Sequence, residues 1–279
     1  MEPIGAQTLH ARFGMDKMVH LWLPTGLPIV QPVDARPSGK PSVYSRVFFR
    51  FIDWLRHRIA LASLVGDRPI FSNGQFPWVA GLEAQAPAIR AELADLLSER
   101  QRLPAFHEIS PDVGQITSDD QWKTFVFMGY GLRSGRNLAR CPATARALTG
   151  IPGIRTAFFS ILEPGKRIPL HTGPYNGVLR LHLGLVVPEP AERCWIEVGG
   201  ERYSWREGRA VVFDDLYPHA VHNDTDGLRA VLFVDFERPC RAPVRWLNRL
   251  VLLAAPFTDE IRRGKANHDA WEKGYYGKK

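Results

Sequence analysis

Four histidines between residues 171 and 222 could bind a metal ion. His171 lies in a loop that contains Gly and Pro, and His219 directly follows the segment FDDLYP. Two imidazoles brought together from distant strands suit a borderline divalent metal such as Fe(II) or Zn(II). Alternation along 213–219 favours His219 as the second ligand, with His222 as the alternative. His182 completes the group, and any one of the four could instead be an ordinary structural residue.

An arginine that could bind a carboxylate follows this group of histidines in the sequence. Arg229 comes ten residues after His219 and begins an apolar strand, so alternation puts it on the same face as Val231 and Phe233. A buried guanidinium is costly unless a carboxylate meets it, and its bidentate geometry suits a small diacid. This spacing is the one expected where 2-oxoglutarate chelates iron and anchors its far carboxylate on the arginine. The alternative is a surface arginine at a strand edge.

The segment HTGPYNGVLRLHLGLVVP, residues 171–188, must position part of this group. Residues 178–186 alternate as a strand, with Arg180 and His182 on the face opposite to the leucines. We expect the leucine face to pack outward from a barrel against helices, and the Arg180 and His182 side chains to point inward. The leucines are Leu179, Leu181, Leu183 and Leu185.

The supporting elements change in character near residue 120. Before it, 83–100 predicts a helix, and after it short apolar segments alternate with Gly, Pro, Asn or Asp. EVGGER at 197–202 predicts a hairpin turn. Many short antiparallel strands favour a sandwich or barrel, of which the jelly roll is one closed form. The expected fold is therefore mainly β with α, with a helical N-terminal half packed on a β-barrel.

We expect a single globular unit with four parts. Residues 1–42 form an irregular arm rich in Pro and Gly, and 43–119 form a helical support region. Residues 120–240 form the β core, and 241–279 form a basic helix and tail.

Composition excludes several classes. The 279 residues carry a formal net charge of +7, but the basic residues are scattered, which argues against nucleic-acid binding. The three cysteines are widely spaced and form no CxxC motif, so the sequence indicates neither a zinc site nor a disulfide framework. No apolar run approaches a membrane span and the N-terminus lacks a signal-peptide core, so we expect a cytoplasmic protein.

Two amphipathic segments leave a second possibility for location. Residues 43–65 place aromatic and aliphatic residues at helical spacing with arginines between them, and 243–257 repeat the pattern. Such helices either pack on the domain or rest on an anionic membrane surface. Peripheral contact with the inner membrane is therefore a possible addition to the cytoplasmic location.

Across roughly residues 120–239 the chain resembles the aspartyl/asparaginyl β-hydroxylases, which are Fe(II)- and 2-oxoglutarate-dependent dioxygenases on a double-stranded β-helix of the jelly-roll, cupin-like type. The order and spacing of several segments carry the resemblance. They are FFSILEPG, HTGPYNGVLRLHLGLVVP, YSWREG, VVFDDLYPHAVHN and LRAVLFVDFERP.

The resemblance assigns roles to six residues. It implies that His171 and His219 hold the iron, and that Arg229 binds the distal carboxylate of 2-oxoglutarate with help from Ser160. It also implies that His182 and Arg180 lie near the metal-proximal carboxylate, with Arg180 reaching an acidic group of the substrate. The co-substrates would be 2-oxoglutarate and O₂.

One position departs from the wider dioxygenase superfamily. Most of those enzymes place a carboxylate two residues after the first histidine, which completes a facial triad. Here that residue is Gly173. The β-hydroxylases with HTGP resemble this chain in lacking the acid, so two histidines and water would complete the metal's ligands.

The resemblance leaves the substrate open. The family name suggests the β-carbon of Asp or Asn in a protein, a peptide or a free amino acid. A related branch hydroxylates acyl chains of lipid A, and the YSWREG and FERP segments resemble it too. Against that branch, the chain shows no anchoring span and no acid after the first histidine. A non-catalytic cupin-like metal- or ligand-binding protein is the alternative of another class.

Overall fold

The computed structural model describes residues 43–277, and the irregular arm expected at 1–42 lies outside the described residues. The described strands form two sheets in which all pairings are antiparallel. The larger sheet has the order β1 (Ile70–Phe71), β9 (Ala210–Phe213), β6 (Val178–Val186), β11 (Arg229–Glu237), β4 (Ile154–Leu162), β2 (Trp122–Gly129) and β3 (Leu132–Arg133). The smaller has the order β5 (Arg167–His171), β10 (His219–Asn223), β7 (Cys194–Val198) and β8 (Glu201–Ser204).

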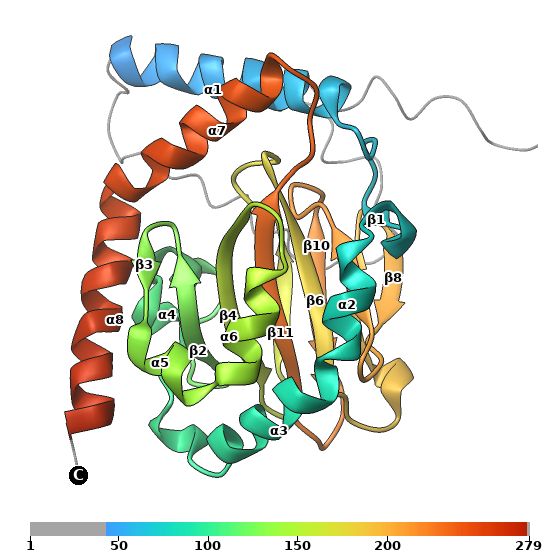
Figure 1. Ribbon diagram of the computed structural model, residues 1–279, viewed down its shortest axis with the longest axis vertical. Coiled ribbons are helices and arrows are strands. Elements are labelled where there is room, and N and C mark those ends of the chain that lie inside the picture. Colours follow the sequence, from blue (N-terminus) through green and yellow to red (C-terminus); the bar gives the residue numbers. More distant parts are fainter. Residues whose placement is uncertain (1–42, 278–279) are drawn as a thin grey trace, which may run out of the picture.

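Eight α-helices accompany the sheets in the part of the chain that is described. Figure 1 shows α2, α3, α5 and α6 against the larger sheet, α8 along one side, and α1 and α7 together at one end. This is the expected jelly-roll arrangement, mainly β with α. The helices are α1 (Val43–Ala62), α2 (Trp78–Ala84), α3 (Ala86–Leu97), α4 (Phe106–Ile109), α5 (Gly135–Arg140), α6 (Pro142–Thr149), α7 (Val244–Ala254) and α8 (Asp259–Gly277).

The larger sheet separates two apolar cores. On its outer face the four leucines of β6 pack with Ile89 and Leu93 of α3, as the alternation predicts. On its inner face Val231 and Phe233 of β11 pack with Trp205 and with the inner residues of the smaller sheet. The inner core is where polar side chains of β6 and β11 must find partners, because alternate residues of these strands point into it.

The sequence predictions about membrane spans and cysteines can be compared with the described residues. None of the helices within residues 43–277 is long and apolar enough to cross a membrane. The three cysteines are buried and free.

Candidate active site

The two sheets bring His171 and His219 together. The residues are direct partners in the antiparallel pairing of β5 and β10. Their ring centroids lie 4.1 Å apart, at an interplanar angle of 51°. His171, which was expected in a loop, lies at the end of β5. Two strands therefore bring together imidazoles that are 48 positions apart in the chain.

Both rings have one nitrogen committed to the backbone. Nδ1 of His171 lies 2.8 Å from the carbonyl oxygen of Pro169, and Nδ1 of His219 lies 3.0 Å from that of Tyr217. A carbonyl accepts a hydrogen bond, so Nδ1 carries the proton in each ring and Nε2 keeps its lone pair. Metal-bound histidines commonly have this arrangement, because it fixes the tautomer and the ring orientation.

The same surroundings keep the rings uncharged. Burial lowers the pKa of His171 to about 4, and the nearby Arg180 guanidinium opposes protonation further. Burial, His171 and Arg180 together hold the pKa of His219 well below its ordinary value. Neutral imidazoles at neutral pH are the form that ligates a metal ion.

Gly173 and Asp215 explain why no acid follows the first histidine. The N–H of Gly173 donates to the carbonyl of Asp215 at 2.7 Å, and a Cβ at position 173 would overlap the Asp215 carboxylate. A side chain is excluded there, and the Asp215 carboxylate occupies the space instead. No group of three or more His, Cys, Asp or Glu side chains that could hold a metal ion occurs within the described residues.

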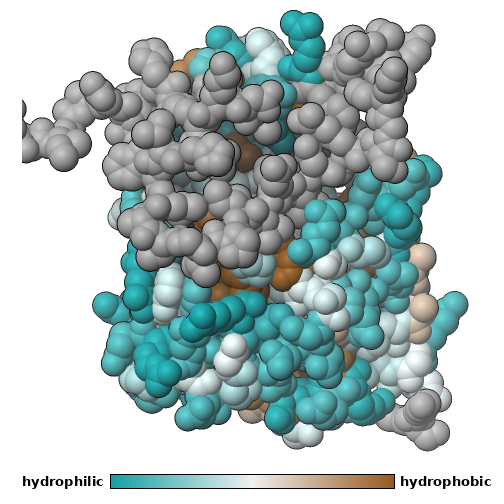
Figure 2. Space-filling model, turned by 180° about the vertical axis from the view of Figure 1, so that it is seen from behind, coloured by the Kyte–Doolittle hydropathy of each residue, from teal (hydrophilic) through white to brown (hydrophobic). Residues whose placement is uncertain are grey.

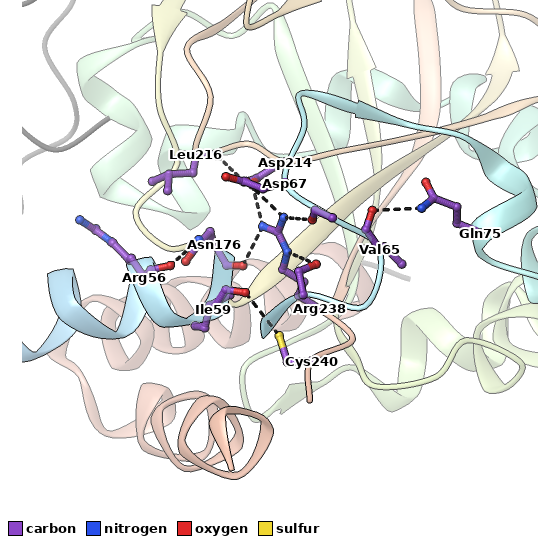
Figure 3. A network of polar contacts seen from close by, with 12 residues as sticks. Arg56, Ile59, Val65, Asp67, Gln75, Asn176, Asp214, Leu216, Arg238 and Cys240 are labelled. Carbon is purple, nitrogen blue, oxygen red and sulfur yellow. Dashed lines mark hydrogen bonds and ion pairs between the residues drawn. The ribbon is translucent and has the colours of Figure 1, made fainter. Parts of the chain in front are cut away.

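Asp214 and Asp215 are neighbours with different partners. Asp214 forms a fully buried ion pair with Arg238 at 2.7 Å, and Arg238 also donates to the carbonyl of Gly66 at 2.8 Å (Figure 3). Asp215 turns the other way, toward Gly173 and Arg180. The Arg238 network fixes the segment that leads to His219, and it leaves Asp215 as the carboxylate beside the histidines.

Arg180 lies between two carboxylates. Its Nη2 is 3.0 Å from Oδ2 of Asp215, and its Nε donates to Oδ1 of Asp235 at 2.8 Å. The guanidinium also lies 4.3 Å above the ring of Phe233. Burial and the neighbouring Asp235 raise the pKa of Asp215, while Arg180 opposes this rise. Arg180 is thus brought to the histidine pair with its charge already compensated.

Arg229 has no such compensation. Its side chain is buried, with 1% of the residue exposed, and no carboxylate among residues 43–277 forms an ion pair with it. Its Nη1 makes two long hydrogen bonds to Ser160, of 3.3 Å to the carbonyl and 3.4 Å to Oγ, and its Nε has no partner. The guanidinium lies 4.6 Å from the ring of Trp205, and burial lowers its pKa to about 10. A buried cation without an anion is the signature expected of a site for an acidic ligand.

Ser160 and His182 offer further polar atoms in the same interior. Oγ of Ser160 accepts hydrogen bonds from Nε1 of Trp122 at 2.9 Å and from Arg229, so its own hydrogen remains available to a ligand. His182 is buried beside Phe213 and Phe233, and neither of its ring nitrogens has a hydrogen-bond partner. Unpartnered buried polar atoms are costly, so their presence here fits a small acid with oxygen atoms at both ends.

His222 lies on the other side of its strand. Along β10 the residues His219, Val221 and Asn223 are buried, and His222 is half-buried on the opposite face. Its ring stacks on Trp195 at 4.0 Å rather than on another histidine. Of the two histidines considered for the second ligand, the structure brings only His219 to His171.

Two residues at the site were not among those selected from the sequence. Asp235 follows Arg229, Val231 and Phe233 at alternating positions, so an acid in an otherwise apolar strand was a usable signal. Tyr130 carries a positive φ of 40° at the turn after β2. Burial and the carboxylates of Asp235 and Asp215 raise its pKa, while Arg180 lowers it. No local pattern predicted that long-range approach.

The family comparison agrees with this geometry. Residues 83–239 match the family model described as aspartyl/asparaginyl β-hydroxylase. An ornithine lipid ester-linked acyl 2-hydroxylase from Rhizobium tropici is 45% identical over 240 residues, which are 86% of this chain and 85% of that protein.

Other relatives match a shorter region. The human aspartyl/asparaginyl β-hydroxylase is 33% identical over 48% of this chain and 18% of its own length. A mouse aspartate β-hydroxylase domain-containing protein 2 is 38% identical over 44% of this chain and 38% of its own length. Since the family model covers more than half of the chain and the Rhizobium tropici relative covers most of it, the chain belongs to the aspartyl/asparaginyl β-hydroxylase family.

Proposed function

We propose that this protein is an Fe(II)- and 2-oxoglutarate-dependent dioxygenase that hydroxylates an unactivated C–H bond. The observation that carries the proposal is the buried, unpaired Arg229 in the same interior as the His171–His219 pair. A two-histidine metal site and a separate anchor for a carboxylate are what a metal-chelating diacid requires. The family membership supports hydroxylation as the reaction type.

His171 and His219 would hold the metal through Nε2. Their Nδ1–H groups would donate hydrogen bonds to backbone carbonyls. These bonds restrict rotation of each ring, and Nδ1 cannot accept a further proton. When bound, iron, 2-oxoglutarate and O₂ supply the oxidising chemistry: 2-oxoglutarate leaves as succinate and CO₂, and one oxygen atom enters the C–H bond. The histidine pair leaves more metal positions open than a facial triad does.

Arg229 would receive the far carboxylate of 2-oxoglutarate. The free Nε and the weakly bonded Nη1 give it a donor edge, and the Ser160 hydroxyl can donate to the same group. Trp205 and Phe233 exclude water around this position, which strengthens charge-assisted hydrogen bonds. His182, held neutral by burial and by Arg229, can donate a hydrogen bond without adding a second positive charge.

Arg180 would act as a positioning residue. Its ion pair with Asp235 fixes the guanidinium. The guanidinium in turn holds the Asp215 carboxylate next to Gly173. That carboxylate is available to hydrogen-bond water on the metal. The reach of Arg180 to a substrate acid, expected from the resemblance, remains a prediction.

For the substrate we propose an ester-linked acyl chain of a membrane lipid. The support is the extent of the similarity: the acyl 2-hydroxylase matches along 86% of this chain, whereas the human Asp/Asn enzyme matches along 48%. The second candidate is the β-carbon of an Asp or Asn residue, supported by the family description and the human relative.

A paired product screen tests both candidates. Purified protein with Fe(II), 2-oxoglutarate and O₂ is offered ornithine lipid, or peptides containing Asp and Asn, and both succinate and a mass gain of one oxygen atom are measured. We expect lipid hydroxylation with one succinate per product, abolished in His171→Ala and retained in His222→Ala. Hydroxylated peptide with unmodified lipid would select the second candidate. Hydroxylation that does not depend on 2-oxoglutarate would overturn the proposal as a whole.

A further inference from the structure

We propose that α1 and α7 form a docking face for an anionic lipid membrane. The proposal extends the proposed function, because a lipid substrate would be met at such a surface, but it rests on separate observations. All nine large apolar side chains that are exposed among the described residues lie in two segments, 48–64 and 246–257. We call this surface, formed by α1, α7 and the residues that follow each helix, the docking face.

The exposed apolar residues are not the ones that hold the helices in place. In α7, Val244, Asn248 and Leu252 are buried, while Trp246 and Leu250 lie on the opposite side and are 55% and 65% exposed. In α1, Leu55 and Ile59 are buried against α7 and its neighbours, and other apolar residues remain outside. Each helix therefore has one apolar side that packs on the protein and a second apolar side that is exposed.

Trp54 and Phe51 extend this outer apolar side along α1. Their rings stack at 5.9 Å while both residues stay exposed. Exposed apolar residues gathered on two adjacent helices, rather than scattered singly, are typical of an interaction surface. In Figure 2 the described surface away from α1 and α7 is mostly hydrophilic.

The charge of the two helices identifies the partner. Their sequences carry six arginines, four in α1 and two in α7, against one acidic residue, Asp53. Asp53 is paired with Arg56. Arg245 and Arg249 lie 4.6 and 5.5 Å from the Trp246 ring, an apolar and cationic pairing suited to the headgroup level of a bilayer. A second copy of the chain on this face would bring two sets of arginines together, which disfavours a symmetric dimer.

The docking face is joined directly to the metal site. The loop 172–177 follows His171, and Arg56 of α1 donates to the carbonyl of Pro174 in that loop. The Asn176 side chain donates back to the carbonyl of Arg56 at 3.0 Å. From α7, Asn248 accepts from the Tyr175 hydroxyl at 2.9 Å and donates to the carbonyl of Gly177 at 2.8 Å.

These contacts join both helices to the loop that follows His171, the proposed metal ligand at the end of β5. Docking α1 and α7 on a membrane would therefore hold the site at a fixed position relative to the lipid. Figure 1 shows the two helices side by side at one end of the molecule, where the loop between β5 and β6 also lies.

Vesicle co-sedimentation tests the docking face without using the enzyme's activity. The full chain is mixed with vesicles of phosphatidylcholine alone, or with added phosphatidylglycerol, in the absence of iron and 2-oxoglutarate. We expect binding to the anionic vesicles, weakened by salt. We expect it to be roughly tenfold or more weaker for Trp246→Ser/Leu250→Ser and for Arg50→Gln/Arg58→Gln. The control Arg146→Gln/Arg193→Gln removes two exposed arginines elsewhere and should bind like the wild type.

Several results would overturn the docking face. These are no binding by the wild type, equal binding by all variants, a dimer in solution that dissociates in the Trp246→Ser/Leu250→Ser variant, or binding that appears only after residues 1–42 are removed. Circular dichroism checks that each variant is folded, and the charge variant leaves the apolar residues in place. Because these vesicles contain no ornithine lipid, membrane binding can succeed while the proposed hydroxylation fails, and the reverse.

Discussion

Two arginines on neighbouring strands of one sheet, the half-buried Arg180 and the buried Arg229, have opposite surroundings. Arg180 on β6 contacts the carboxylates of Asp215 and Asp235, at 3.0 and 2.8 Å. Among the described residues, the Arg229 side chain on β11 hydrogen-bonds only to the carbonyl and hydroxyl of Ser160, at 3.3 and 3.4 Å. The charge of Arg180 is balanced by carboxylates of the protein, whereas Arg229 forms no ion pair with the described residues. Burial of a charge is tolerable only with compensation, so the difference separates a structural arginine from the one that we propose binds an anionic ligand.

Removing Arg180 should produce the largest loss of stability. Arg180→Leu would leave the Asp215 and Asp235 carboxylates buried together, and breaking a buried pair in this way costs about 3–5 kcal/mol. Urea unfolding measures the loss. Adding Asp235→Asn removes one of the stranded charges and should recover part of it. If Arg180→Leu unfolds at the same urea concentration as the wild type, Arg180 does not stabilise the Asp215 and Asp235 carboxylates. The contrast between the two arginines would then disappear.

Removing Arg229 should have the opposite profile. Arg229→Gln deletes an unpaired buried charge, so the unfolding free energy should stay level or rise. Binding of 2-oxoglutarate should weaken by about 2–5 kcal/mol, because a buried charge pair is lost from the complex. Calorimetric titration of 2-oxoglutarate and the KM for this co-substrate measure the effect. A variant that binds 2-oxoglutarate normally would assign the distal carboxylate to another group.

The contrast also predicts stabilisation by the ligand. At 100 times its Kd, 2-oxoglutarate with Fe(II) under anaerobic conditions should stabilise the wild type by about 2.7 kcal/mol. For a chain of this size that raises Tm by roughly 2–4 °C per kcal/mol. His222→Ala should keep the shift, since His222 faces away from the site, and Arg229→Gln should lose most of it. Equal shifts in both variants would mean that the ligand binds elsewhere.

The sequence predicted one arginine's surroundings better than the other's. Alternation along a single strand was enough to turn Arg229 inward with Val231 and Phe233, and the jelly-roll class followed from the run of short strands and turns. The partners of Arg180 depend on register between strands: β6 pairs with both β9 and β11, which sets Arg180 opposite Phe213 and Asp235. Periodicity within a strand carries no information about which strands pair.

The close approach of Gly173 to Asp215 has the same origin. The sequence shows that the acid is missing after His171, and the resemblance explains it as a two-histidine site. That the Asp215 carboxylate fills the space follows only from how the loop after β5 meets the segment after β9. A contact between two loops far apart in the chain leaves no local pattern.

The two arginines also act on different histidines, and this predicts the smallest effect, a pH dependence. After burial, Arg180 is the charge that most opposes protonation of His171, and Arg229 does so for His182. His171 has a folded-state pKa of about 4 against an ordinary value of 6.5. Between these values the unfolded chain binds the proton and the folded chain does not, so stability falls as pH decreases through this window.

The slope from His171 alone is at most about 1.4 kcal/mol per pH unit. Asp215 works in the opposite direction, because its raised pKa lets the folded chain hold a proton that the unfolded chain releases. Comparing metal-free wild type with His171→Gln by urea unfolding at pH 7 and at pH 5.5 cancels the Asp215 contribution. We expect the wild type to lose more stability than the variant on acidification. Equal losses of stability in the wild type and the variant would mean that His171 is not held neutral. Arg180 would then have no electrostatic effect on the His171–His219 pair.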